Sequence, residues 1–527
     1  MEDCAAKWPS TVALKVPILG SQPAAWRDVT FTQFKQDVEF VAAYWADKLE
    51  KQKTEDRPVV CVWLKGVSYM DLLHQWGIAR AGFIPQLISL RMTDPTVVYQ
   101  LLQKSKAIAI VHDESFSDIL KDSPVPTWSA NYILDNQEIR AKNLVVPDLW
   151  KPTLPDDTTM IFHTSGSTSG MPKLVPISAS WNEYSLTKAA AMDAMLPSKS
   201  PQPTMVSIGS FSHMGSTMLF HQSFNKGGCY ILASTIPYPK EELQLMIEEH
   251  GLNMLSMFPP ALSSVLRHGR ENPGFLKSLQ KLEYLMYGGL GLDAADTAWA
   301  QEQGLVLVNV FGSTEVGIGL LSNGSTKTAD LERLPGSKVE LIPIEDEGLG
   351  EQLYELVVPP EARDCPDPSL RSAVDGKFHT GDLFAESGPG KYTFKGRNDD
   401  WIKMEMALRC DTGSIEKNTM ATCGADLVET VVVVGVGRPS PTLIVEPKNA
   451  DMDLDPNGAD VKELREEIFK RITPFHQRRY IHERIDDPRF IMVMPRGTLP
   501  RTVTKGNVRR KQTEEAFQVQ LNQIYAC

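Results

Sequence analysis

The chain has few cysteines, and their arrangement excludes several classes of protein. The seven cysteines of its 527 residues are scattered, none forms a CxxC pair, and their number is odd. This pattern predicts free thiols in a reducing compartment rather than a disulfide framework. The sequence also lacks an N-terminal apolar run and any run near about 18 apolar residues. We therefore expect a cytoplasmic protein with no signal peptide and no membrane partner.

An excess of positive charge is missing as well. The formal net charge is −12, and the hydrophobic fraction of 42% is ordinary for a globular chain. A protein that binds nucleic acid through its phosphates needs a basic face, so no nucleic-acid partner is expected. At roughly 100–200 residues per domain, the length predicts at least two domains.

Short apolar runs alternate with helical patterns over the first three quarters of the chain. The patterns at 32–51 and 94–104 predict helices, and the runs predict strands. Alternation of strand and helix is typical of an α/β fold with a largely parallel sheet. The predicted strands are 59–64, 108–112, 159–163, 205–209, 254–258, 284–287 and 305–311.

The sequence pattern changes after about residue 395, where a polar break is followed by a smaller segment of predicted strands and a helix. The polar stretch 396–400 (GRNDD) precedes a smaller segment with predicted strands at 431–436 and 489–494 and a predicted helix at 460–471. Polar, glycine-containing breaks often mark domain boundaries. We predict a large domain of parallel-rich sheets and helices over 1–397, joined by a hinge to a small α+β domain over 398–527.

A loop rich in glycine and hydroxyl groups lies between two predicted strands. Residues 165–173 (SGSTSGMPK) follow the strand that ends near Thr164 and precede a short strand at 174–177. Backbone N–H and side-chain O–H groups in such a loop can bind phosphate oxygens, and Lys173 adds a positive charge. No GK[ST] sequence is present, so this is not a Walker loop. Alone, such a loop is more often a linker, but its position between strands favours phosphate binding.

Residues 164–173 resemble the phosphate-binding signature of the adenylate-forming superfamily, which includes acyl-CoA synthetases, adenylation domains of nonribosomal peptide synthetases, and luciferases. The resemblance extends over nearly the whole chain, because further motifs follow in the order of the family. They are 310–315 (VFGSTE), 379–382 (HTGD), 396–400 (GRNDD) with 402–403 (IK), and 499–506 (LPRTVTKG). Five motifs in order are far more specific than one.

The resemblance implies ATP and Mg²⁺ as cofactors and assigns a role to each motif. Glu315 is the expected magnesium ligand, and Thr314 and Thr164 are expected to donate to phosphate oxygens. Asp382 and Arg397 are expected to hold the ribose, and Lys505 to reach the α-phosphate. The remaining nucleotide-binding residues of the resemblance are Ser165, Gly166, Ser167, Thr168, Gly170, Lys173, Gly288, Gly289, Leu290, Phe311, Gly312 and Ser313.

Four assignments depart from the family pattern or have a simpler interpretation. Phe311, expected on the adenine, stands where the family usually has tyrosine, and Lys505 precedes Gly506 instead of following it. The hinge, expected at Asp399, continues through 404–409 without the usual glycine. The pair Gly288 and Gly289, expected to line the adenine and acyl pocket, is equally consistent with a simple turn.

The stretch 208–215 resembles the segment that gates the acyl pocket in the family. His213 occupies the gate position, and Met214 stands near the place where amino-acid-activating members carry an aspartate for the substrate ammonium. Methionine cannot pair with that ammonium, so the resemblance implies an aryl or apolar carboxylic acid without an α-amino group. The simpler interpretation of Met214 is core packing.

The implied activity is attack of a carboxylate on the α-phosphorus of ATP, giving acyl-AMP and pyrophosphate. The acyl group then passes to coenzyme A or to the 4′-phosphopantetheine of a carrier domain. A carboxylic acid is ionised at pH 7, so no general base is needed. The Lys-Gly order resembles adenylation domains of fungal secondary metabolism. The open alternatives are a free-standing acyl-CoA ligase, an amino-acid-activating domain, a luciferase-like oxygenase and a non-enzymatic nucleotide-binding regulatory domain.

Overall fold

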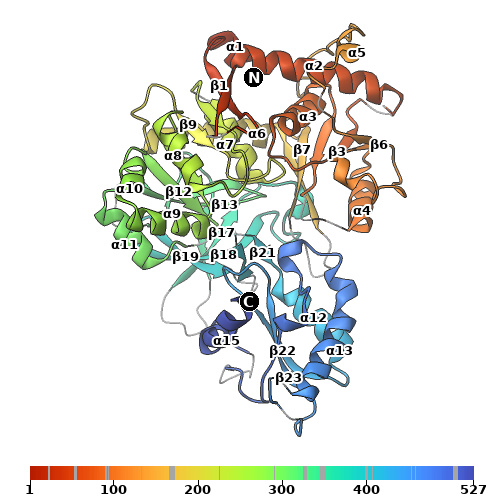
Figure 1. Cartoon of the computed structure of the whole chain (residues 1–527), viewed down its shortest axis with the longest axis vertical. Helices are drawn as coiled ribbons and strands as arrows, with labels where there is room; N and C mark the ends of the chain where they lie inside the picture. Colours follow the sequence, from red (N-terminus) through yellow and green to blue (C-terminus); the bar gives the residue numbers. More distant parts are fainter. Residues whose placement is uncertain are drawn as a thin grey trace. The chain divides into compact units, whose positions relative to one another are not determined.

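The computed structural model forms two compact units. The described residues are all except 22–23, 53–55, 90–91, 93, 132, 165–171, 225, 290, 325–328, 345–351, 398–401, 406–407, 453, 457, 502–507 and 527. The first unit contains Met1–Leu90, Tyr99–His163 and Leu174–Gly396. The second contains Arg91–Val98, Thr164–Lys173 and Arg397–Cys527. Figure 1 shows the chain coloured along its sequence.

Most of the described strands of the first unit form two large sheets. The order of the six-stranded sheet is β6 (Thr127–Ser129), β5 (Ala109–His112), β3 (Val59–Trp63), β4 (Ile84–Leu87), β7 (Thr158–Thr164) and β8 (Lys173–Ser178). The order of the nine-stranded sheet is β15 (Glu332–Arg333), β14 (Gly317–Leu321), β13 (Leu307–Ser313), β12 (Tyr284–Gly288), β11 (Met254–Met257), β9 (Thr204–Val206), β10 (Cys229–Ile231), β1 (Val12–Pro17) and β2 (Trp26–Thr30).

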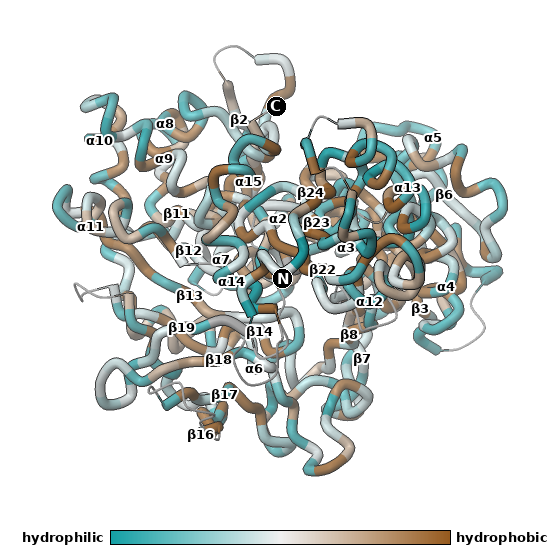
Figure 2. The backbone as a smooth tube through the Cα atoms, turned by 90° about the horizontal axis from the view of Figure 1, so that it is seen from below, coloured by the Kyte–Doolittle hydropathy of each residue, from teal (hydrophilic) through white to brown (hydrophobic). Residues whose placement is uncertain are grey.

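The inner strands of the nine-stranded sheet are apolar because helices cover both of its faces. Successive residues on β11 and β12 divide between two cores: Met254 and Met286 face one, and Leu255 and Leu285 face the other. This alternation is what a period-2 strand gives when both faces are buried. Figure 2 shows hydrophobic colour along β12 and β13.

The helices begin where local sequence satisfies their free N–H groups. Thr30 and Gln33 form a capping box at the start of α2, and Ser68 and Asp71 form one at the start of α3. Each box pairs two backbone N–H groups that a helix start would leave open. The described helices of this part are α1 (Glu2–Lys7), α2 (Phe31–Leu49), α3 (Tyr69–Arg80), α4 (Pro95–Ser105), α5 (Gln137–Arg140), α6 (Ala179–Met195), α7 (Met214–Phe224), α8 (Lys240–Glu248), α9 (Pro259–Glu271), α10 (Pro273–Leu279) and α11 (Ala294–Glu302).

A smaller antiparallel sheet completes the first unit. Its described strands lie in the order β16 (Glu340–Pro343), β17 (Leu353–Val358), β18 (Phe378–Gly388) and β19 (Lys391–Arg397). Phe384 of β18 and Phe311 of β13 are buried in the same apolar cluster, so this sheet packs against the end of the nine-stranded sheet.

The second unit is a small α+β domain with its own core. Its described strands are β20 (Ile402–Lys403) paired with β21 (Arg409–Cys410), and the three-stranded sheet β22 (Val428–Val434), β23 (Thr442–Pro447) and β24 (Ile491–Val493). Val433 faces one apolar cluster and Val432 and Val434 face the other. Both faces are therefore covered, by residues of α12 (Thr412–Cys423) and α13 (Ala459–His476) on one side and of α15 (Gln518–Tyr525) on the other. The short α14 (Arg510–Ala516) precedes α15.

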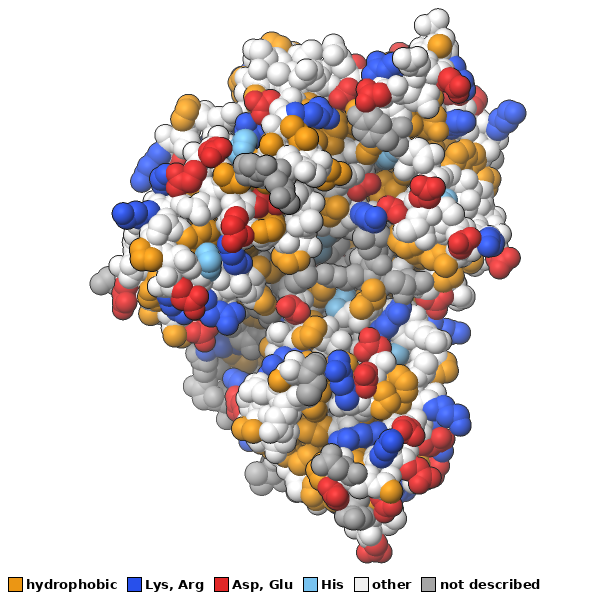
Figure 3. Space-filling view, viewed as in Figure 1, with side chains coloured by type: hydrophobic (Ala, Val, Ile, Leu, Met, Phe, Trp, Pro, Cys, Tyr) orange, Lys and Arg blue, Asp and Glu red, His pale blue; other side chains and the backbone are white. Residues whose placement is uncertain are grey.

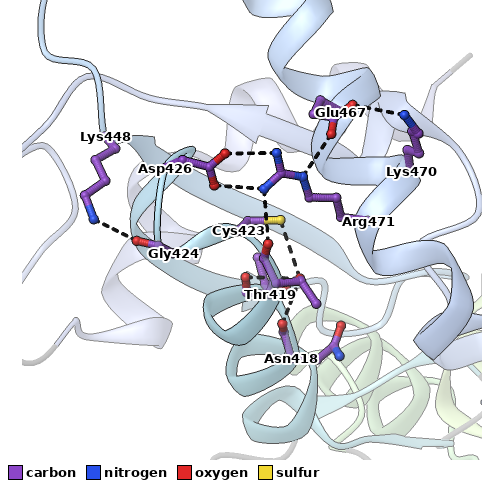
Figure 4. A network of polar contacts seen from close by, with 10 residues as sticks. Asn418, Thr419, Cys423, Gly424, Asp426, Lys448, Glu467, Lys470 and Arg471 are labelled. Carbon is purple, nitrogen blue, oxygen red and sulfur yellow. Dashed lines mark hydrogen bonds and ion pairs between the residues drawn. The ribbon is translucent and has the colours of Figure 1, made fainter.

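An arginine links α13 to the end of α12. Arg471 makes two parallel hydrogen bonds to Asp426, of 2.8 and 2.9 Å, and a third of 2.9 Å to Glu467 (Figure 4). The hydrogen bonds from Arg471 hold the pKa of the Asp426 carboxyl below its ordinary value. Bidentate arginine–carboxylate pairs fix orientation as well as distance.

On the face shown in Figure 3, basic and acidic side chains are interspersed over the surface.

The predicted two-part α/β fold is confirmed, although several element ends differ. The strand predicted at 205–209 ends at Val206 because the chain leaves the sheet there and turns into α7. The helix predicted to end at residue 471 continues past Pro474 to His476, since Ile472 and His476 are buried against the core. Among the described residues, no helix is both long enough and apolar enough to cross a lipid bilayer.

The close packing of α2 against α3 depends on a glycine. A Cβ atom on Gly77 would lie 2.6 Å from Cγ1 of Val41 and 3.1 Å from its backbone carbon. We expect Gly77→Ala to lower the free energy of unfolding by about 1–3 kcal/mol through overpacking, despite the better helix propensity of alanine. Thermal unfolding measures the effect. Gly274→Ala in α10 is the control, because its Cβ would meet nothing within 4 Å. Equal melting of Gly77→Ala and wild type would contradict the packing argument.

Candidate active site

Several predicted site residues meet at one edge of the nine-stranded sheet. Strands β9, β11, β12 and β13 run parallel, so their carboxyl ends lie at the same edge. Phe258 follows β11, Gly289 follows β12, and Thr314 and Glu315 follow β13. The crevice outside the carboxyl ends of parallel strands is where open α/β sheets bind ligands.

The turn from β13 to β14 is possible because two of its residues are glycines. A Cβ atom on Gly312 would lie 2.6 Å from the carbonyl oxygen of Gly317. Gly317 itself has a φ of +68°, a left-handed conformation that favours glycine. The backbone N–H of Val316 donates to Oγ of Ser313 at 3.3 Å. This tight turn presents Thr314 and Glu315, both partly exposed.

Two glycines also shape the neighbouring strand end. A Cβ atom on Gly288 would lie 2.5 Å from the carbonyl oxygen of Val310 on β13, and Gly289 has a φ of +87°. These positions need glycine for close approach and for left-handed backbone. Leu290 lies outside the described residues.

Phe311 lies in an aromatic cluster at the base of this edge. Its ring centroid is 4.9 Å from that of Phe384, edge to face, and 5.7 Å from that of Phe394. The residue is 7% exposed. Edge-to-face packing fixes the plane of the ring. Its stacking on adenine stays a prediction.

The predicted gate residues lie at the start of α7. The ring of His213 is exposed and lies 5.8 Å, edge to face, from the ring of Phe258. Met214 is 4% exposed and belongs to the main core. The assignment of both residues, with Gly289, to the acyl pocket stays a prediction.

The predicted ribose motif lies on β18 and is held by Glu355, which the sequence did not single out as a site residue. The Gly381 N–H donates to Oε1 of Glu355 at 2.9 Å, and Oε2 of Glu355 lies 3.0 Å from Nδ1 of His379. Asp382 is fully buried, and its N–H donates to Oγ1 of Thr380 at 3.0 Å. Only the register of β17 against β18 brings Glu355 beside this motif.

The phosphate loop begins and ends at described residues. Thr164 ends β7, and Lys173, which is exposed, begins β8. Just before the loop, Nδ1–H of the partly buried His163 donates to the carbonyl of Leu87 at 2.8 Å. Burial lowers the pKa of His163 to about 4, so the ring is neutral at pH 7. A neutral ring held in this way fixes the end of β7 without adding charge.

Several predicted site residues lie outside the described part of the chain. They are Ser165, Gly166, Ser167, Thr168 and Gly170 of the phosphate loop, Asp399 of the hinge, and Lys505. Arg397 ends β19, and only its backbone is described.

The described residues fit a magnesium ion that is shared with a nucleotide. Among them, no group of three or more histidine, cysteine, aspartate or glutamate side chains could hold a metal ion. Mg²⁺ in nucleotide sites is usually bound by one or two carboxylates together with substrate phosphates. The single carboxylate of Glu315, at the rim of the edge described above, suits such a shared site.

We expect His379 to stabilise the fold in a pH-dependent way. Hydrogen bonds to Glu355 and then Asp375 raise the pKa of His379. Its contribution is therefore fully present below the unfolded pKa of about 6.5 and is lost as pH rises through the folded pKa. The melting temperature of His379→Gln should fall further below wild type at pH 6 than at pH 9. A difference that is the same at both pH values would contradict this account.

Comparison with known proteins agrees with this geometry. Residues 1–343 match the family described as AMP-binding enzyme, and residues 399–527 match the AMP-binding enzyme C-terminal domain. The AMP-binding domain-containing enzyme iboA of Amanita muscaria (strain Koide BX008) is 32% identical over 511 residues, which cover 94% of this chain and 96% of iboA. The non-canonical non-ribosomal peptide synthetase ascB of Acremonium egyptiacum is 23% identical over 94% of this chain, which spans 45% of that longer relative.

Solved structures share the fold. The o-succinylbenzoate-CoA synthetase of Bacillus subtilis, bound to a product analogue, superposes with a TM-score of 0.72 at 16% identity, covering 98% of both chains. The resemblance to the adenylate-forming superfamily is thus confirmed. The chain belongs to the family of AMP-binding, adenylate-forming enzymes.

Proposed function

We propose that this enzyme activates an aryl or apolar carboxylic acid as an acyl-adenylate and then transfers the acyl group to a pantetheine thiol. One observation carries the proposal: Gly288, Gly289 and the turn that bears Thr314 and Glu315 lie at one carboxyl edge of a parallel sheet. That edge offers backbone groups, hydroxyls and a carboxylate to a nucleotide and an acid side by side.

In the proposed first step, a carboxylate oxygen of the acid forms a bond to the α-phosphorus of ATP. The bond from that phosphorus to the bridging oxygen breaks, and its electron pair leaves with pyrophosphate. No proton is transferred, so the residues act by positioning and by neutralising charge. Thr164 and Thr314 donate to phosphate oxygens, Asp382 accepts from the ribose, and Lys505 adds positive charge. Glu315 would hold a magnesium ion, which would neutralise charge on the phosphates.

The acceptor and the movement of the second domain are also proposals. Coenzyme A and a carrier domain are both candidate acceptors, supported respectively by the CoA synthetase and the peptide synthetase among the relatives. We propose that residues 398–527 move about Asp399 between the two steps. The separate family matches on either side of residue 399 support this division.

Exchange of labelled pyrophosphate into ATP across a panel of acids tests the proposal. The panel contains aryl, alkyl and α-amino acids, each with and without coenzyme A. We expect exchange with aryl or alkyl acids in the absence of any thiol. Preference for α-amino acids would overturn the substrate proposal, and the absence of exchange with every acid would overturn the activity.

We expect Glu315→Gln to raise the Mg²⁺ concentration that gives half-maximal exchange. The amide keeps the shape of the side chain but removes the anionic oxygen that a hard cation prefers. The KM for the acid should stay within about twofold of the wild-type value. The substitution does not change the interactions that bind the acid equally in the ground state and the transition state. An unchanged Mg²⁺ titration would remove Glu315 from the site.

We expect Lys505→Ala to lower the exchange rate by roughly 10²–10³, the usual cost of losing one group that faces developing phosphoryl charge. ATP binding, measured by calorimetry, should persist. Lys511→Ala on α14 is the matched control, since Lys511 is an exposed lysine of the same unit. Exchange at the wild-type rate by Lys505→Ala would show that Lys505 has no catalytic role.

A further inference from the structure

Helix α6 reaches the turn that carries Glu315 at two points. Nε1–H of Trp181 donates to the backbone carbonyl of Glu315 at 3.1 Å, and Nζ of Lys188 donates to the carbonyl of Val316 at 2.9 Å. Trp181 and Lys188 are seven residues apart, which is about two helical turns, so both project from the same face of α6. The Trp181 ring also lies against Gly317, where an added Cβ would be 3.1 Å away.

Lys188 is a buried cation with a buried partner. The residue is 5% exposed, and its Nζ lies 2.5 Å from Oδ2 of Asp364, which is 1% exposed. Burial lowers the pKa of Lys188, and the charge of Asp364 opposes that shift. Removing one partner of a buried pair leaves an uncompensated charge, which is strongly destabilising. Asp364 therefore keeps Lys188 charged where it meets the Val316 carbonyl.

Arg363, the residue before Asp364, contacts the first turns of α6. Nε of Arg363 donates to Oγ of Ser180 at 3.2 Å, and its guanidinium lies over the ring of Tyr184 at 5.5 Å. Two adjacent residues of one loop thus fix both the start and the middle of the helix. Because α6 is held in this way, its two donors have defined positions relative to the β13–β14 turn.

Stability alone is a poor explanation for this buried pair. Oδ1 of Asp364 is buried and has no hydrogen-bond partner among the described residues. Asp364 and Lys188 line a cavity together with Met192, Met218 and Ile318. Apolar residues of similar volume are often as stabilising as a buried ion pair, or more so. The feature that apolar residues would not reproduce is the hydrogen bond from Lys188 to the turn.

We propose that Lys188 and Trp181 are positioning residues that hold the backbone on the carboxyl side of Glu315, and thereby aim its carboxylate at the metal–nucleotide complex. Asp364 acts indirectly, because its carboxylate keeps Lys188 charged. The inference rests on the proposed role of Glu315. Both side chains contact the backbone of the turn, and the proposed role acts through these contacts.

The test uses a double variant, Lys188→Met/Asp364→Leu, because Lys188→Met alone would bury an unpaired carboxylate. The double variant makes both positions apolar and removes the hydrogen bond to Val316 together with the ion pair and the contact of Lys188 with the Tyr184 ring. Thermal melting is measured with ATP in the presence and in the absence of Mg²⁺. The difference in melting temperature reports metal-dependent ATP binding without relying on catalytic activity. We expect the double variant to melt near wild type, but to lose most of the Mg²⁺-dependent part of the ATP-induced rise in melting temperature. We expect its half-maximal Mg²⁺ concentration in exchange to rise by about tenfold, the lower end of the usual cost of losing a group that orients a metal ligand.

Trp181→Phe should shift the Mg²⁺ midpoint in the same direction but less, since the indole ring is mostly replaced and only its N–H is lost. Lys226→Met is the matched control, because the half-exposed Lys226 pairs with Asp193 near the carboxyl end of α6. A well-folded double variant with a wild-type Mg²⁺ midpoint and a wild-type melting increment would overturn the positioning role while leaving the proposed function intact. If Glu315→Gln itself leaves the midpoint unchanged, the proposed role of Glu315 fails, and the positioning role fails with it.

Discussion

Burial of both faces of the nine-stranded sheet is the constraint on which the rest of the structure depends. Alternate residues of β11 and β12 fill two separate cores, so apolar side chains cover both faces of these two strands. The strand ends are the places where unpaired backbone groups and polar side chains can meet a solute. The candidate site therefore lies at an edge, and its predicted residues come from several strands that are far apart in sequence.

Close backbone approach is the second requirement at this edge. Gly288, Gly312 and Gly317 each lie where a Cβ atom would collide with a neighbouring backbone or ring. They let β12, β13 and β14 converge so that Thr314 and Glu315 project from a short turn. A larger residue at any of the three would move the turn before it affected the core.

Three titratable groups lie beside predicted site residues and have fixed surroundings. His163 is held neutral by burial at the end of β7, whereas Lys188 is held charged by Asp364. His379 lies between two carboxylates, one of which also binds the Gly381 N–H. An enzyme that neutralises phosphoryl charge by position needs such fixed surroundings, because reorientation of loose dipoles would cost free energy in the transition state.

The sequence by itself determined the family, the two-part α/β architecture and the order of the motifs. The reason is that each apolar run and each loop motif consists of consecutive residues. It also predicted most strands and helices, with errors at ends such as 206 and 476, where packing overrode local preference. It could not reveal that Asp364 pairs with Lys188, that Glu355 binds Gly381, or that Trp181 holds the carbonyl of Glu315. Glu355 and Gly381 are 26 residues apart in the sequence, and Lys188 and Asp364 are 176 residues apart. Only the tertiary structure decides such pairs, because register and helix packing, and not spacing along the chain, bring their atoms together.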